Sequence, residues 1–387
     1  MNIPYGKQDI TDADLEAVLK TLKSDWLTQG PVVNEFETEV STKCSAKYAL
    51  ATNSATSALH IACLSLDLGS NDELWTSPNT FVASANCAIY CDAKIDFVDI
   101  DPATYNICPH ALEQKLIAAK KLNKLPKIVI PVHFSGLSCD MEEIHRLSIE
   151  YGFKIIEDAS HAIGGSYKDF SIGSCKYSDI TIFSFHPVKI ITTGEGGMAL
   201  TNDKNLAKKL ELFRTHGITR DTDEMLGHVD GPWFYQQKAL GFNYRITDFQ
   251  ASLGLSQLKR LDEYVKKRNQ IAQRYQDKLK EFPVTFQEIK NDRYSAFHLF
   301  VINLVNEEDI SNRKEIFEQL REAGVGVNVH YIPVHLHPFY ASMGFSEGDF
   351  PNSENYYKSA ITLPLHPKLT ISEQDYVIDK LLNSISK

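Results

Sequence analysis

Short apolar runs alternate with longer segments of helical periodicity over the first 200 residues of the chain. The apolar runs predict strands at 47–51, 73–77, 94–99, 127–133, 153–157, 179–185 and 197–201. Helical patterns fall between several of them, at 57–66, 110–121 and 140–151. Because this alternation is typical of βαβ units, it predicts an α/β fold with a mostly parallel sheet flanked by helices. Functional loops then gather at the carboxyl ends of the strands.

The pattern is different at the two ends of the chain. Near the start, residues 12–23 predict an amphipathic helix whose apolar face consists of Leu15, Val18, Leu19 and Leu22. Later elements are a charged helix over 256–280, a strand over 296–305, a helix over 312–323 and a strand over 325–331. These elements predict a smaller C-terminal α+β domain. We therefore divide the chain into a large α/β domain, 1–250, and a small domain, 251–387.

Composition narrows the class of protein. The 387 residues are 43% hydrophobic and 23% charged, which is ordinary for a globular enzyme. A formal net charge of -10 disfavours nucleic-acid binding, which needs excess Lys and Arg. We see no signal peptide and no apolar run long enough for a membrane span. Seven dispersed cysteines without a Cys-x-x-Cys pair indicate reduced thiols and a cytoplasmic location.

A lysine in a glycine-rich context is the first candidate for chemistry. Lys189 lies in the run Ser184-Phe-His-Pro-Val-Lys-Ile-Ile-Thr-Thr-Gly-Glu-Gly-Gly197, after a predicted strand and before a turn. A lysine amine can form a Schiff base with an aldehyde cofactor, and desolvation that lowers its pKa from about 10.4 raises its reactivity. On position alone, a surface lysine beside a loop is the better interpretation.

A carboxylate upstream favours a cofactor-binding lysine over a surface lysine. Asp158 ends the predicted buried strand Lys154-Ile-Ile-Glu-Asp, where an ion without a partner is costly. Pyridoxal 5'-phosphate (PLP) needs such a carboxylate at its pyridinium nitrogen, because the protonated ring is the electron sink. A strand-end cap or a salt bridge explains Asp158 equally well when it is considered alone. Together with Lys189, it favours a PLP site.

Two weaker signals point to the same cofactor. Small hydroxylated residues, among them Ser54, Ala55 and Thr56, follow one strand and open a helix, where free N–H groups bind phosphate. Routine helix capping by Ser and Thr is the alternative. Phe81 follows another strand and can stack on a flat ring, although an aromatic residue there is more often part of the core.

These stretches resemble the DegT/DnrJ/EryC1/StrS family of sugar-nucleotide aminotransferases, which has the aspartate-aminotransferase-like fold type I. The resemblance covers nearly the whole chain. It also includes Trp26-Leu-Thr-Gln-Gly-Pro31, Arg214-Thr-His-Gly-Ile-Thr219, the stretch 241–251, and Val329-His-Tyr-Ile-Pro-Val-His-Leu336.

The resemblance implies a role for each matching position. Lys189 would hold PLP as an internal aldimine and shuttle a proton, and Asp158 would bind the pyridinium nitrogen. The other implied cofactor contacts are His161 at the ring hydroxyl, Phe81 stacked on the ring, and Ala55, Thr56, Ser184 and the other subunit's Asn243 at the phosphate. The implied substrate contacts are Tyr5, Trp26, His330, Tyr331 and His335. The family also implies a homodimer, and it places the pair His335 and His337 in a loop at the mouth of the site with no metal.

Several runs look most like the enzymes of pseudaminic acid synthesis: 184–197, 157–162, 231–235 and 330–336. This similarity implies amination of C4 of UDP-2-acetamido-2,6-dideoxy-β-L-arabino-hexos-4-ulose by L-glutamate, for flagellin glycosylation and surface polysaccharide. A D-xylo UDP-4-keto sugar and a dTDP-sugar remain alternative substrates. A PLP sugar dehydratase would have histidine at the position of Lys189, and a non-catalytic PLP-binding regulator would carry a DNA-binding segment.

The diphosphate of a UDP-sugar needs cationic partners. The candidates are Lys7, Arg214, Arg220 and Arg245, and each of them could equally be a solvated surface charge.

Overall fold

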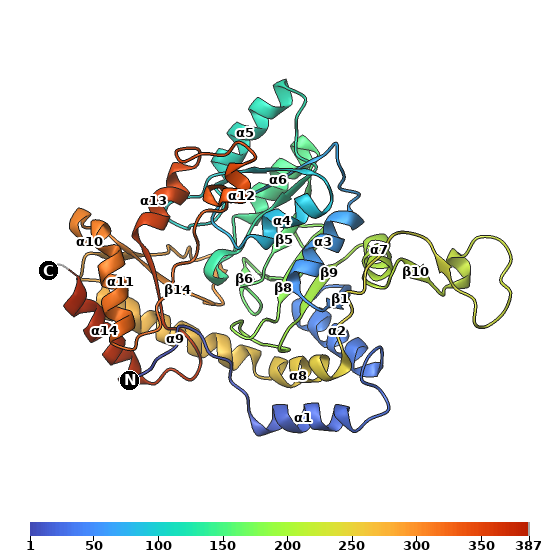
Figure 1. Cartoon of the computed structure of the whole chain (residues 1–387), viewed down its shortest axis with the longest axis horizontal. Coiled ribbons are helices and arrows are strands. Elements are labelled where there is room, and N and C mark those ends of the chain that lie inside the picture. Colours follow the sequence, from blue (N-terminus) through green and yellow to red (C-terminus); the bar gives the residue numbers. More distant parts are fainter. Residues whose placement is uncertain (386–387) are drawn as a thin grey trace.

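A seven-stranded sheet forms the centre of the computed structural model, which describes residues 1–385 (Figure 1). The strand order is β1-β9-β8-β5-β4-β2-β3. Their bounds are β1 (Tyr48–Thr52), β2 (Glu73–Thr76), β3 (Lys94–Phe97), β4 (Ile128–Ile130), β5 (Lys154–Asp158), β8 (Ile180–Ser184) and β9 (Gly197–Thr201). Strand β9 runs antiparallel to β1 and β8, and the other neighbours pair in parallel. The predicted mostly parallel sheet is confirmed.

Successive residues of the central strands point to opposite faces of the sheet, and each face is covered by helices. Leu74, Ile130 and Ile156 join one core with α3 (Ala55–Ser65), α4 (Ala83–Tyr90) and α7 (Lys204–Arg214). Trp75 and Val129 point the other way, toward α5 (Pro109–Lys121) and α6 (Met141–Tyr151). Strands buried on both faces consist mostly of apolar residues, which is why hydrophobic runs located them in the sequence.

A smaller sheet lies in the C-terminal third of the chain. Its strands are β12 (Val284–Phe286), β14 (Phe300–Leu304) and β15 (Ala360–Leu363), all antiparallel. Helices α9 (Leu261–Leu279), α11 (Arg313–Glu322) and α14 (Ile371–Ser384) pack on it, and Ile3 from the N-terminal segment joins their core. The division at residue 250 stays a prediction. Helix α8 (Asp248–Leu258) runs across that position and packs on α1 (Asp12–Leu22) and α2 (Pro31–Cys44).

The remaining elements are short. They are β6 (Ser166–Tyr167), β7 (Phe170–Ser171), β10 (Ile218–Thr219), β11 (Gln236–Gln237), β13 (Arg293–Tyr294), α10 (Glu307–Ser311), α12 (Pro338–Ala341) and α13 (Pro351–Ser359). Strands β10 and β11 pair at the base of an arm that projects from the body (Figure 1). Among the helices of residues 1–385, none combines the length and hydrophobicity of a membrane span.

One of the predicted elements is wrong, and the start of another is misplaced. The predicted strand 325–331 makes only single bridges, from Val325 to Ile3 and from Asn328 to Thr362. Its alternating valines resemble a strand, but its later residues leave the small sheet and line a cavity. The single helix predicted over 256–280 is two helices, α8 and α9, which are separated at Lys259 and Arg260.

Helix α1 lies where it was predicted, but it does not bury its leucines. Leu15, Leu19 and Leu22 are 60%, 51% and 51% exposed, whereas Asp14 is fully buried. The Asp14 carboxylate forms an ion pair with Arg260 at 2.7 Å and accepts a hydrogen bond from the Thr11 N–H group at 2.9 Å. Because this paired carboxylate turns inward, the apolar stripe of α1 faces away from the rest of the chain.

Candidate active site

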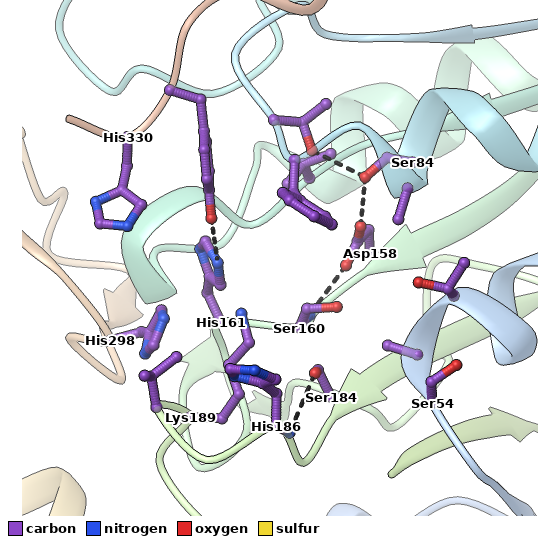
Figure 2. Close-up of a pocket in the computed structure, with 18 of the residues that line it drawn as sticks. Ser54, Ser84, Asp158, Ser160, His161, Ser184, His186, Lys189, His298 and His330 are labelled. Atoms are coloured by element: carbon purple, nitrogen blue, oxygen red, sulfur yellow. Dashed lines mark hydrogen bonds between the residues drawn. The ribbon is translucent and has the colours of Figure 1, made fainter. Parts of the chain in front are cut away.

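The carboxyl ends of β5 and β8 and the start of α3 open onto one cavity of about 430 Å³. Figure 2 shows Ser54 on the α3 side of this cavity and Lys189 beside His161 and His298 on the other side. Many of the predicted site residues line it: Tyr5, Ala55, Thr56, Phe81, Asp158, His161, Ser184, Lys189, His330 and Tyr331. Residues far apart in the sequence thus meet at the carboxyl ends of the strands, where functional groups were expected.

Three predicted residues lie outside the cavity. Asn243 is exposed and pairs with Thr215, and Trp26 is 55% exposed beside α1, α2 and α8. His335 is fully buried, and its Nε2 lies 2.9 Å from a carboxylate oxygen of Glu354. The expected position of His335 at the mouth of the site is therefore corrected to a position in the core.

Lys189 lies in the turn between β8 and β9, within the cavity wall. Its backbone N–H group donates to the carbonyl of His186 at 2.9 Å, which fixes the turn. Burial lowers the pKa of the Lys189 amine to about 8, and the nearby Asp158 charge opposes part of that shift. Near neutral pH, a larger fraction of this amine is therefore unprotonated and nucleophilic than in a lysine with an ordinary pKa.

The pH dependence of this amine is testable. We expect the cofactor-free protein to take up PLP about tenfold faster at about pH 9 than at about pH 7, because the unprotonated fraction rises through a pKa of about 8. The rate is measured from the absorbance change on mixing with PLP. A lysine with an ordinary pKa would instead keep accelerating well above pH 9, and Lys189→Ala should abolish the pH-dependent phase.

Asp158 offers the cavity a buried carboxylate that forms no ion pair within the described part of the chain. It is 5% exposed at the end of β5, and among residues 1–385 it forms no salt bridge. Its Oδ2 accepts from the Ser84 hydroxyl at 2.6 Å, and its Oδ1 accepts from the Ser160 N–H group at 3.1 Å. These two bonds fix the carboxylate and leave acceptor capacity toward the cavity. A protonated ring nitrogen fits this site.

The start of α3 supplies backbone donors. The Ser54 side chain caps the helix by accepting from the Ser57 N–H group at 3.1 Å. The N–H groups of Ala55 and Thr56 precede it in the first turn, where no intrahelical acceptor exists, and both residues line the cavity. The Ser184 hydroxyl lies in the same wall. This arrangement suits a phosphate group.

Gly197 lets the start of α3 lie close against the sheet. It begins β9 and lies opposite Thr52 of β1 and Ser184 of β8. A Cβ atom at this position would lie 2.4 Å from the Ala55 nitrogen and 2.4 Å from the Ser54 carbonyl carbon. Only glycine lets the strand pass this close to the start of α3.

Gly197→Ala should therefore displace the start of α3 and weaken PLP binding. Overpacking typically costs about 1–3 kcal/mol, which corresponds to roughly a tenfold or larger loss of cofactor affinity if the strain is relieved at this loop. Titration with PLP and thermal unfolding measure both effects. Gly69→Ala is the matched control, because a Cβ at Gly69 meets nothing within 4 Å. Equal affinity in the two variants would contradict the prediction.

Comparison with known proteins agrees with this geometry. The DegT/DnrJ/EryC1/StrS aminotransferase family matches residues 8–382. The chain belongs to this family. The UDP-4-amino-4,6-dideoxy-N-acetyl-beta-L-altrosamine transaminase of Campylobacter jejuni is 37% identical over 100% of this chain and 98% of its own. The spore coat polysaccharide biosynthesis protein SpsC of Bacillus subtilis is 39% identical over 97% of this chain and 95% of its own.

A solved structure gives the same result. PseC of Helicobacter pylori, an aminotransferase of pseudaminic acid biosynthesis, superposes with a TM-score of 0.89 at 30% identity, covering 99% of each chain. The protein is therefore a PLP-dependent sugar aminotransferase with fold type I, as its sequence predicted. A buried carboxylate, a lysine and a helix start with free N–H groups line its cavity, and they suit the ring nitrogen, the aldehyde and the phosphate of this cofactor.

A chain of hydrogen bonds fixes the histidine beside Lys189 in this aminotransferase. The Ser135 N–H group donates to His161 Nδ1 at 3.3 Å, so the proton of the neutral ring is on Nε2. That Nε2–H donates to the Tyr331 hydroxyl oxygen at 3.1 Å. Burial, and then the charge of Lys189, hold the pKa of His161 well below its usual range, which keeps the ring neutral. Both ring nitrogens of His161 are used, and the Tyr331 proton remains free for a ligand.

Tyr331→Phe removes that free donor. Because one hydrogen bond is worth about 0.5–1.5 kcal/mol, we expect kcat/KM to fall by about three- to tenfold. Tyr356→Phe is the matched control, since its hydroxyl donates to the His330 carbonyl at 2.6 Å and does not line the cavity. The control should lower the melting temperature without changing kcat/KM. Equal losses of activity in both variants would assign Tyr331 a purely structural role.

Some residues in and around the cavity were not predicted from the sequence. Ser84 orients Asp158 from α4, and the Thr80 hydroxyl lies 2.8 Å from Ser84. The buried His298 ring packs on His161 with centroids 4.4 Å apart. No local motif marks these residues, because their roles arise from tertiary contacts. In contrast, the candidate Arg214 is buried and forms ion pairs with Glu37 and Glu211, so it is not a free partner for a diphosphate.

Proposed function

We propose that this aminotransferase transfers an amino group from L-glutamate to C4 of UDP-2-acetamido-2,6-dideoxy-β-L-arabino-hexos-4-ulose. This reaction belongs to pseudaminic acid synthesis in the cytoplasm, for the glycosylation of flagellin or surface polysaccharide. The observation that carries the transaminase chemistry is the meeting of Lys189 and Asp158 in one cavity. The similarity to the Campylobacter transaminase and to PseC supports the choice of sugar.

In this proposal the side chains divide the parts of PLP among them. Asp158 would hold the ring nitrogen, Phe81 would cover the ring, and the Lys189 amine would hold the aldehyde group. Ala55, Thr56, Ser184 and the partner subunit's Asn243 would hold the phosphate. PLP supplies the electron sink that stabilises a carbanion next to nitrogen. Lys189 then moves a proton at C4 of the sugar, and its lowered pKa suits that exchange near neutral pH.

The substrate would lie against the remaining cavity wall. Tyr5, His330 and Tyr331 line it, and we propose that they contact the sugar or the amino donor. Burial lowers the pKa of His330 to about 3, so its ring is a neutral hydrogen-bonding group. Its Nδ1 lies 2.9 Å from the Thr362 hydroxyl, which orients the ring.

We further propose that the enzyme acts as a homodimer with shared active sites. The outward-facing leucines of α1, Leu15, Leu19 and Leu22, support this proposal, because such an apolar stripe is costly in water. Trp26 is also uncovered and follows α1. A second subunit over this surface would bury the stripe, and Trp26 and Asn243 would then serve the partner's cavity.

A different nucleotide sugar is the alternative. The similarity to SpsC, a spore coat polysaccharide protein, is as high as that to the Campylobacter enzyme, so a D-xylo UDP-4-keto sugar or a dTDP-sugar is the alternative substrate. The sugar dehydratase requires a histidine where this chain has Lys189.

Mass spectrometry of the sugar nucleotide tests the proposal. Pure protein is incubated with PLP, glutamate and either the L-arabino or the D-xylo UDP-4-keto sugar, beside Lys189→Ala. We expect an amine only on the L-arabino sugar and only with Lys189 present. Amination of the D-xylo sugar alone would overturn the pathway and keep the transaminase. No amination of either UDP-sugar would direct the search to dTDP-sugars.

A further inference from the structure

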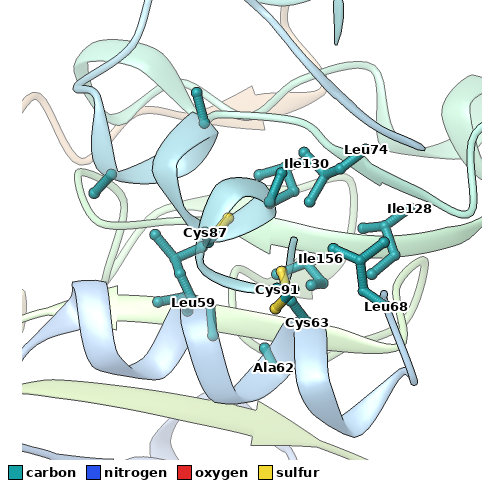
Figure 3. Close-up of a cluster of buried hydrophobic side chains, with 14 of the residues drawn as sticks. Leu59, Ala62, Cys63, Leu68, Leu74, Cys87, Cys91, Ile128, Ile130 and Ile156 are labelled. Carbon is teal, nitrogen blue, oxygen red and sulfur yellow. The ribbon is translucent and has the colours of Figure 1, made fainter. Parts of the chain in front are cut away.

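Three cysteine thiols meet in the core between α3 and α4. Both helices begin at the cavity and run away from it, and Cys63 lies in the last turn of α3. Cys87 lies in the last turn of α4 and Cys91 is its C-cap residue. Figure 3 shows the sulfur atoms of Cys63 and Cys91 close together between the helices.

The contacts give these thiols different properties. The Cys63 thiol neighbours those of Cys87 and Cys91, and Cys91 also neighbours His60, which lies one turn before Cys63 on α3. His60 is itself positioned, because its Nδ1 lies 3.2 Å from the Tyr244 hydroxyl. Cys63 and Cys87 are fully buried, whereas Cys91 is 7% exposed. Within the cluster, Cys91 is therefore the thiol that a small solute reaches first.

The pKa shifts of the two thiols also indicate that Cys91 reacts before Cys63. The neighbouring Cys63 thiol, and after it His60, lower the pKa of Cys91 to about 6 against the effect of burial. Burial raises the pKa of Cys63 well above its usual range. Of the two thiols, Cys91 therefore ionises more readily, and Cys63 keeps its proton to higher pH. Redox-sensing cysteines combine a thiolate with some solvent access and an adjacent second thiol in this way.

We propose that Cys91 and Cys63 form a reversible, peroxide-oxidisable dithiol pair. The Cys91 thiolate attacks one oxygen of hydrogen peroxide, the O–O bond breaks, and Cys91 becomes a sulfenic acid while the leaving hydroxide takes a proton from solvent to give one water. The Cys63 sulfur then attacks the Cys91 sulfur, the S–O bond breaks, and the leaving hydroxide takes the Cys63 proton as a second water. Two thiols are oxidised to one disulfide while the peroxide is reduced.

This bond would tie together the two helices that position the cofactor groups, since α3 carries Ala55 and Thr56 and α4 carries Ser84. The pair lies at the far ends of these helices, outside the cavity. Its oxidation is therefore independent of the proposed substrate, and the two proposals can fail separately.

Peptide mapping tests the bond in the full-length protein. Reduced protein is treated with hydrogen peroxide, remaining thiols are alkylated, and the digest is compared before and after dithiothreitol. Trypsin leaves all three cysteines on the peptide 48–94, because no Lys or Arg lies between Lys47 and Lys94. A cut at an acidic residue between Asp67 and Glu73 separates Cys63, and a cut after Tyr90 separates Cys87 from Cys91.

We expect Cys63 and Cys91 to become linked, losing two hydrogen atoms, and dithiothreitol to restore them. Cys87→Ala is the matched control and should form the same bond. Cys63→Ala should instead accumulate a sulfenic acid at Cys91 that dimedone traps. A bond from Cys63 to Cys87, a bond between subunits, or oxidation of the less buried Cys108 before Cys91 would overturn the proposal. The wild-type digest alone gives these outcomes, even if a variant fails to fold.

Discussion

Lys189→Ala is expected to abolish amination while leaving the protein folded. Proton transfer by a positioned side chain typically contributes about 10²–10⁴-fold, so kcat should fall by at least that range. The variant also loses the amine that binds the aldehyde of PLP, and the absorbance band of the bound cofactor should disappear. Single-turnover kinetics with glutamate and absorbance spectra of the purified variant measure the two losses independently.

The stability of Lys189→Ala should not fall with its activity. Burial lowers the folded-state pKa of Lys189 to about 8, below its unfolded value, so below about pH 8 the buried charged amine opposes folding. Removing it should leave the melting temperature at neutral pH unchanged or higher. A small primary amine added to the solution should restore part of the proton transfer. A variant that keeps more than about a tenth of wild-type kcat would remove Lys189 from the mechanism.

The sheet was predictable because its central strands are buried on both faces. Leu74 and Trp75 of β2 face different cores, but both are apolar. Such a strand therefore appears in the sequence as one hydrophobic run. Lys189 and Asp158 were predictable for a related reason. Each follows or ends such a run, and the ends of parallel strands converge.

Features that depend on distant partners were not predictable. The inward turn of Asp14 requires Arg260, which lies 246 positions later, and it reverses the face that α1 presents to the core. Ser84 reaches Asp158 across 74 positions and carries no motif. The proton position on His161 follows from Ser135 and Tyr331, neither of which is adjacent to it in sequence. In each case the sequence contains the residue, but only the fold shows its partner.

Asp158→Asn is expected to have the second largest effect, because the side chain keeps its shape and loses its charge. Removing one partner of a buried charge pair typically costs about 3–5 kcal/mol, so kcat should fall by roughly 10²–10⁴-fold. An uncharged amide no longer stabilises a protonated ring nitrogen, and the electron sink weakens with it. The amide oxygen still accepts from the Ser84 hydroxyl, which now lies 2.6 Å from the carboxylate, so the fold should persist.

Glu157→Gln is the matched control for this variant. Glu157 precedes Asp158 on β5 and faces the other side of the sheet, where it accepts hydrogen bonds from Thr181 and lies 2.7 Å from His133. The buried partners of Glu157 hold its pKa below the usual range, so its loss should lower the melting temperature and leave kcat nearly unchanged. The two substitutions remove the same charge one residue apart. If they lowered kcat equally, the charge of the strand end would matter rather than contact between Asp158 and the ring nitrogen.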